Sequence, residues 1–300
     1  MSSTDKSFIE VFEDYKLYAK KRHKAQGYIT TMQDFNNHIL PYFKNRTIQS
    51  LTKIDIIDWQ NEILEHNFSN KYNAKLYYDF SVFIKYCMAY SYLDSNIVLE
   101  AGKFTKKVEV KEHVTYTLRQ FRKYRRHLKD YVLKQYFNCM YFYGTRPSET
   151  MAFRFCDIEK NNMFVRHNLR RKGDRCLDTP KNQSSVRKLK INWLMRFRIR
   201  KLKKLYTKRY GIFKPEYFIF GGDKPLAPTT IDRYKKEACK KAKLRHITQH
   251  EFRHSYATRM IHKGIPIDYV SKRMGHSQIS TTVDVYLHQE KSTYNKCTFQ

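Results

Sequence analysis

The sequence has few acidic residues, no closely spaced cysteine pair and no long apolar run. Its six cysteines are scattered without a C-x-x-C pair, which excludes a disulfide framework and a cysteine zinc cluster. No stretch approaches the roughly 18 apolar residues of a membrane span, and the N-terminus carries no apolar signal segment. We therefore expect a cytoplasmic protein with reduced thiols and no membrane partner.

The shortage of acidic residues leaves a strong positive charge. The 300 residues include 59 Lys and Arg against 28 Asp and Glu, which gives a formal net charge of +31. These basic residues run along the whole chain, and the sequence pI is about 9.8. A solvated basic surface is one interpretation, but this charge favours a nucleic acid partner. The hydrophobic content of 41% suffices for a packed core in one large or two ordinary domains.

Residues 8 to about 100 show helical periodicity. Apolar and aromatic residues recur on two stripes, one with Phe8, Ile9, Phe12, Tyr15 and Tyr18 and one with Leu76, Phe80, Phe83, Ile84 and Cys87. Pro41 and the turn-like Asn45-Arg46-Thr47 are expected to separate helices. We predict a small helical domain over residues 1–100, followed by a basic interdomain linker over residues 101–116.

A second domain is expected over residues 117–300, mainly α-helical with a small antiparallel β-sheet. Thr117 with Gln120, and Thr248 with Glu251, have the spacing of helix capping boxes. Turn signals alternate with short segments between residues 157 and 191, and a hairpin tip is expected at residues 182–184. Another helix is expected after Pro228, capped by Thr229.

The segment from His250 to His254 permits two chemistries. It matches the H-E-x-x-H pattern of zinc peptidases. A zinc hydrolase needs a third protein ligand, however, and the extended pattern asks for glycine and histidine where this chain has Ala257 and Met260. Arg253 would also place a cation beside a divalent ion. Zinc chemistry is therefore the weaker alternative.

The other chemistry follows from a resemblance. Residues 137–288 resemble the catalytic domain of tyrosine recombinases, also called phage integrases. Five separate segments stand in the family's order over about 140 residues: Tyr143–Glu149, Thr179–Arg187, His250–Thr258, Met274–Ser277 and Thr281–Tyr286. The resemblance implies catalytic roles for Arg146, Lys181, His250, Arg253, His276 and Tyr286, with Glu149 in support of Arg146. Lys172 and Lys188 are competitors for the role of Lys181.

Physical chemistry gives reasons for these residue types. Attack of a tyrosine on DNA puts extra negative charge on a pentavalent phosphorus, whose oxygens suit the forks of Arg146 and Arg253. One such donor is worth about 10²–10³ in rate, so neither a metal ion nor another cofactor is required. Tyrosine, with a reference pKa near 10, needs a base, and the 5′-hydroxyl leaving group needs an acid. We expect His250 as the base and Lys181 as the acid.

The resemblance also implies an architecture and partners. The N-terminal region resembles the core-binding domain of integrases, so the two domains would form a clamp on double-stranded DNA, with Lys103, Lys106, Lys107 and Lys111 near phosphates. Two protomers would bind each site and four would form the synapse. Since little precedes Phe8, no arm-binding domain is expected, and integration, inversion and resolution stay open. A recombinase-like DNA-binding protein without catalysis is the remaining alternative.

Overall fold

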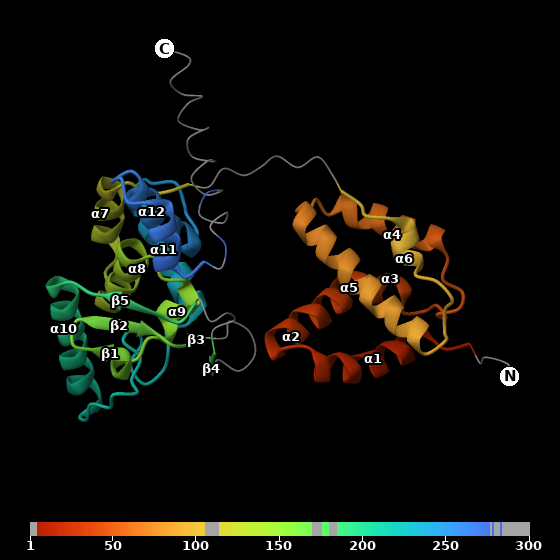
Figure 1. Cartoon of the computed structure of the whole chain (residues 1–300), viewed down its shortest axis with the longest axis horizontal. Helices are drawn as coiled ribbons and strands as arrows, with labels where there is room; N and C mark the ends of the chain where they lie inside the picture. Colours follow the sequence, from red (N-terminus) through yellow and green to blue (C-terminus); the bar gives the residue numbers. More distant parts are fainter. Residues whose placement is uncertain are drawn as a thin grey trace, which may run out of the picture. The chain divides into compact units, whose positions relative to one another are not determined.

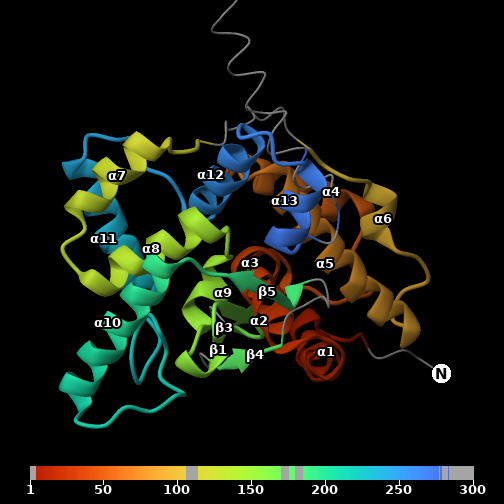
Figure 2. The same cartoon turned by 60° about the vertical axis from the view of Figure 1, so that its left-hand side comes forward.

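The computed structural model describes residues 5–105, 114–169, 176–179 and 185–276, together with residues 278 and 283. The chain divides into two compact units, residues 1–110 and 111–300. Figures 1 and 2 show helices in the first unit and a combination of helices and short strands in the second. The predicted fold class, mainly α-helical with a small antiparallel sheet in the C-terminal domain, is confirmed. None of the described helices could span a lipid bilayer, since each is too short or too polar.

The first unit is a bundle of helices around an aromatic core. Its elements are α1 (Phe8–Arg22), α2 (Ala25–Asp34), a π-helical turn η1 (Phe35–Ile39), α3 (Leu40–Phe43), α4 (Lys53–Glu65), α5 (Asn70–Ala89) and α6 (Ile97–Ala101). The predicted stripe on α5 is confirmed, because Leu76, Phe80, Phe83, Ile84 and Cys87 are all 0% exposed. Trp59 packs into the same core and donates through Nε1 to the carbonyl of His38 at 2.7 Å.

Two local predictions for this unit are wrong. Ile9 is 45% exposed although its neighbour Phe8 is buried, because successive residues lie about 100° apart around a helix. Pro41 does not separate helices: α2 continues through η1 directly into α3. Pro41 sits in the first turn of α3, directly after the wider π-helical turn η1, and the helical path runs through it. The predicted turn at Asn45 follows immediately after α3.

The second unit combines helices with two small sheets. Its elements are α7 (Leu118–His127), α8 (Tyr131–Tyr143), α9 (Pro147–Ala152), a 3₁₀ turn η2 (Phe155–Asp157), β1 (Ile158–Glu159), β2 (Asn162–Val165), β3 (Asn168–Leu169), β4 (Leu177–Asp178), β5 (Arg187–Lys190), α10 (Trp193–Tyr210), α11 (Pro228–Lys241), α12 (Gln249–Ile261) and α13 (Ile267–Met274). Strands β1, β2 and β5 form one antiparallel sheet, and β3 pairs with β4 in another. The expected hairpin tip at residues 182–184 lies outside the described residues.

Helix caps fix where the helices of this unit begin. The capping boxes of Thr117 with Gln120 and of Thr248 with Glu251 are both formed, as predicted. Thr229 is not the cap of α11, which is a correction: Pro228 occupies the first turn, and Ala227 stands at the cap position without a side-chain hydrogen bond. The core joins α8 to α12, with the rings of Phe137 and Phe252 centred 4.8 Å apart.

Candidate active site

The buried carboxylate of Glu149, on α9, holds three guanidinium groups together. Arg187, on β5, binds it with two hydrogen bonds, Nη1 to Oε1 at 2.9 Å and Nη2 to Oε2 at 2.8 Å. Arg146 donates from Nη1 to Oε1 at 2.7 Å, and Arg253, on α12, places Nη1 3.8 Å from Oε2. Glu149 is 1% exposed, so one buried negative charge faces three positive ones. This cluster, called the arginine clamp below, has an excess of positive charge.

The pKa of Glu149 reflects the competition between burial and these cations. Burial raises the pKa of the carboxyl, but the hydrogen bonds and charge of Arg187, followed by the charges of Arg253 and Arg146, lower it to about 2. Arg187 is therefore the main partner of Glu149. The carboxylate stays ionised at every pH at which the protein would act.

Backbone carbonyls at two helix ends hold the other sides of the guanidiniums. Arg253 donates from Nη1 to the carbonyl of Gly144 at 2.8 Å and from Nη2 to that of Met274 at 2.7 Å. Arg146 donates from Nη2 to the carbonyl of Gly275 at 2.6 Å. Gly144 and Gly275 cap the C-termini of α8 and α13, where the helix dipole favours cations. The two arginines are therefore fixed before any ligand binds.

Exposure distinguishes the two arginines. The Arg146 side chain is 28% exposed, whereas that of Arg253 is 3% exposed. Burial lowers the pKa of the Arg253 guanidinium, and the charge of Glu149 opposes that change. An arginine nonetheless remains a cation in a protein. An incoming phosphate would thus meet Arg146 at the surface, with the charge of Arg253 beneath it.

Gly144 makes the approach of α8 to α12 possible. Its backbone is left-handed, with φ of +67°, and a Cβ there would lie 2.4 Å from Cδ1 of Tyr256. Glycine alone tolerates both the conformation and the contact. The turn leads directly into Arg146 and α9, so the position of the first arginine depends on it.

His276 directly follows Gly275, the C-cap of α13, and lies close enough to Arg253 and Arg146 for their positive charges to affect its imidazole. Burial, followed by the positive charges of Arg253 and Arg146, lowers the pKa of its imidazole to about 3. The ring is therefore neutral near pH 7 and has one N–H donor and one acceptor nitrogen. A neutral donor beside two cations suits an oxygen of a bound phosphate.

In the H-E-x-x-H segment, the glutamate that a zinc peptidase uses as general base has a structural role. Glu251, the general base in such an enzyme, uses Oε2 to accept from the N–H of Thr248 and Oε1 to accept from the N–H of Val114 at 3.2 Å. Among the described residues, no group of three His, Cys, Asp or Glu side chains is placed to hold a metal ion. Glu251 therefore serves as a helix cap and as an anchor for residue 114.

The structure brings together Arg146, Glu149, Arg253 and His276 of the predicted site. His250 is exposed in the first turn of α12, the helix that carries Arg253. Lys181 and Tyr286 lie outside the described residues, as do Lys106, Lys107 and Lys111. Lys103, in the first unit, is exposed.

Arg187 is a buried partner of the predicted site that the sequence did not indicate. It ends the segment that carries Lys181, but a basic residue in a short strand is ordinarily taken as solvent-exposed. Its side chain is in fact 8% exposed, and its Nε donates to the carbonyl of Arg273 at 2.8 Å. The pattern of the sequence gives no sign of this burial, because the partners lie 38 and 86 positions away.

Comparison with known families covers both units. Residues 110–293 match the Phage integrase family, and residues 7–64 match the family described as phage integrase, N-terminal SAM-like domain. The ICEBs1 integrase of Bacillus subtilis (strain 168) is 25% identical over 309 residues, which cover 94% of this chain and 79% of that protein.

Solved structures share the fold. The Tn1549 transposon integrase in complex with transposon right end DNA has a TM-score of 0.69 at 20% identity, covering 90% of this chain and 93% of the other. A lambda integrase tetramer bound to a Holliday junction has a TM-score of 0.74 at 16% identity, covering 95% of this chain and 78% of the other.

Proposed function

The chain belongs to the phage integrase family of tyrosine recombinases, and from that premise we propose that it is a site-specific recombinase that cuts and rejoins DNA through Tyr286. The arginine clamp supports this proposal most directly. An excess of positive charge is fixed on one buried carboxylate, within the part of the chain that matches the family. Such a site binds an anion whose charge increases during reaction.

The proposed reaction exchanges one phosphate ester for another. The Oη of Tyr286 attacks the scissile phosphorus while its proton passes to His250, and the bond from phosphorus to the 5′ oxygen breaks as Lys181 donates a proton to that oxygen. Arg146 and Arg253 bind the non-bridging oxygens, and His276 donates a hydrogen bond to one of them. The 5′-hydroxyl of a second strand then reverses the exchange, without ATP or a metal ion.

The relatives suggest a biological setting and an assembly. The names of the ICEBs1 and Tn1549 integrases support a role in moving a genetic element. The lambda integrase tetramer on a Holliday junction supports the binding of two protomers to each site and four in the synapse. We propose that Lys103, Lys106, Lys107 and Lys111 contact DNA phosphates.

Covalent trapping tests the proposal. Purified protein is incubated, with and without EDTA, with nicked duplexes from the DNA that flanks its gene, and SDS-resistant adducts are separated by electrophoresis. We expect an adduct with the wild type and none with Tyr286→Phe, which keeps the ring and removes the nucleophile. An adduct that persists in the Phe variant would refute Tyr286 as nucleophile. An adduct that EDTA abolishes would refute chemistry without a metal.

A further inference from the structure

Helix α10 has a strongly asymmetric composition. Its 18 residues include eight Lys and Arg and no Asp or Glu. Met195, Ile199, Leu202 and Tyr206 recur at helical spacing and are buried in the core of the second unit. The remaining faces of the helix carry the basic residues, and they are open to solvent over much of its length.

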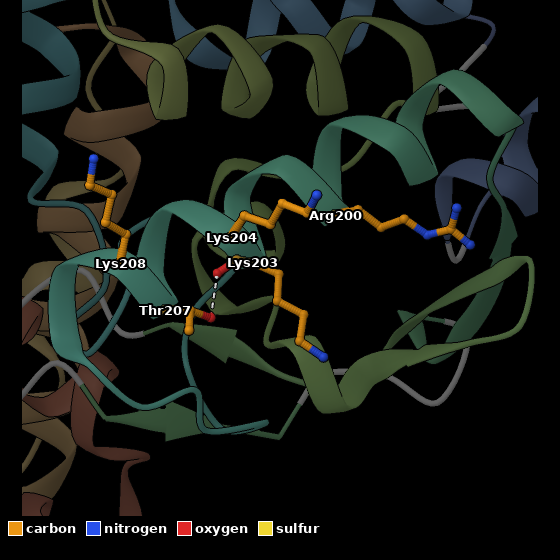
Figure 3. A pocket seen from close by; sticks show the side chains of 5 residues that line it. All are labelled: Arg200, Lys203, Lys204, Thr207 and Lys208. Carbon is orange, nitrogen blue, oxygen red and sulfur yellow. Dashed lines mark hydrogen bonds between the residues drawn. The ribbon is translucent and has the colours of Figure 1, made fainter.

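A hollow on this helix is lined almost entirely by cations. Arg200, Lys203, Lys204, Thr207 and Lys208 surround a shallow space of about 510 Å³. Figure 3 shows the four cationic side chains extending outward from the helix, whereas Thr207 turns back and donates from Oγ1 to the carbonyl of Lys203 at 3.0 Å. Among the described residues, no carboxylate lines the hollow. Lys203 also places Nζ 4.2 Å from the ring centroid of Phe213, a contact that leaves its charge unneutralised. These four cations are called the α10 cation group below.

The helix does not need this charge for its own stability. Arg200 with Lys204, and Lys204 with Lys208, are like charges four positions apart, an arrangement that destabilises a helix. The helix dipole favours cations only within the last turn, which accounts for Lys208 but not for the three earlier members. An external anion would relieve the repulsion among all four.

The α10 cation group lies apart from the arginine clamp. In both Figures 1 and 2, α10 lies on the left-hand side of the second unit, whereas α9 and α12, which carry Glu149 and Arg253 of the clamp, lie to its right. DNA bound at α10 would thus be a different segment from the one that contains the scissile phosphate. Four cations within little more than two turns match the closely spaced charges of a phosphate backbone.

We propose that the α10 cation group binds the phosphate backbone of duplex DNA outside the cleaved site. The inference rests on the proposed function only in taking DNA as the polyanion. Because the contact is with phosphates, it contributes affinity and salt dependence without sequence preference.

The test measures affinity against salt for two DNA lengths. The variant Lys203→Gln/Lys204→Gln/Lys208→Gln removes three charges and keeps good helix-forming residues. On a 200-base-pair duplex, losing three phosphate contacts makes the negative slope of log K against log salt shallower by about 2.7. Between 50 and 200 mM salt the wild type then loses about 40-fold more affinity than the variant. On a short duplex limited to the cleaved site, we expect unchanged affinity and unchanged adduct formation.

The matched control neutralises three exposed lysines on separate loops, Lys160→Gln/Lys214→Gln/Lys263→Gln. It has the same net charge as the α10 variant and should keep the wild-type slope. An α10 variant with the wild-type slope on the long duplex would overturn the proposal, and so would a control that loses as much as the variant. If the α10 variant loses binding to anionic lipid vesicles but keeps the wild-type affinity for both duplexes, DNA is not the partner. Failure of adduct formation in the wild type would instead count against the proposed function.

Discussion

Replacing Arg187 with methionine should disable the arginine clamp while leaving the DNA-binding surface charge almost intact. Methionine has a similar length and no charge, and Arg187 is 8% exposed, so little surface changes. Glu149 would keep Arg146 and Arg253 but lose its bidentate partner. The clamp arginines would then be less firmly positioned relative to each other.

The structure sets the size of the effect. Glu149 has its pKa lowered from 4.5 to about 2, which at 1.36 kcal/mol per unit corresponds to about 3 kcal/mol of stabilisation. Arg187 is the largest favourable contributor. Removing one partner of a buried ion pair typically costs about 3–5 kcal/mol. We expect a loss of about 3 kcal/mol at pH 7 and a decrease of about 10²-fold in the rate of adduct formation.

The loss of stability should depend on pH in a defined direction. Because the folded pKa of Glu149 is below its unfolded value of 4.5, its contribution is complete above pH 4.5 and disappears as the pH falls toward 2. The difference between wild type and Arg187→Met should therefore shrink between pH 4.5 and 2. Urea unfolding at pH 7 and pH 3 measures it.

Two further variants make the result interpretable. Arg166→Met removes an ion pair with Glu159, whose side chains are 41% and 55% exposed, and a longer contact of 3.9 Å with Asp157. Asp157 keeps its hydrogen bond from the N–H of Arg154, so this variant should cost less than Arg187→Met. Arg187→Lys keeps the charge without the bidentate fork and should recover part of the rate. If Arg187→Met costs no more than Arg166→Met, or forms adduct at the wild-type rate once folded, Arg187 does not position the clamp.

Three more outcomes are expected. Gly144→Ala should lower the free energy of unfolding by more than Gly264→Ala, because both have positive φ but only Gly144 has a ring 2.4 Å from the new Cβ; equal losses in thermal unfolding would contradict the packing argument. The pKa of His276 is about 3 in the folded protein and near 6.5 in the unfolded chain. Below pH 6.5 the unfolded chain therefore binds a proton at His276 that the folded protein does not, and the free energy of unfolding falls as the pH falls. His276→Gln should flatten that pH dependence between pH 6.5 and 4.5 in urea titrations, and an unchanged slope would show that the ring does not contribute. Prolonged dialysis against EDTA should leave adduct formation unchanged, and recovery of activity only on adding zinc would restore the zinc interpretation.

The sequence predicted most of the clamp but not what organises it. Arg146 and Arg253 were found through local segments, because the residues next to them in sequence carry the family pattern. Glu149 was predicted as a supporter of Arg146 alone. Its role as a common partner of three arginines depends on β5 lying beside α9, a tertiary contact without a local signal.

The fold prediction succeeded where the signals were local and failed where they competed. The capping boxes of Thr117 and Thr248 depend on a spacing of three residues, and both form. Pro41 was expected to break a helix, but its place in a first turn made it compatible with one. At α11, the preference of proline for the first helical position displaced Thr229 from the cap.

The carbonyls that hold the arginines also determine when during synthesis the site appears. Arg146 bonds to Gly275, which is 129 positions further along the chain, and Arg253 bonds back to Gly144 across 109 positions. A ribosome must therefore translate α13 before either guanidinium has its full set of partners. Contacts of this range close late, after the local helices have formed. A nascent chain that ends before α13 can thus fold individual helices, yet it has no assembled arginine clamp.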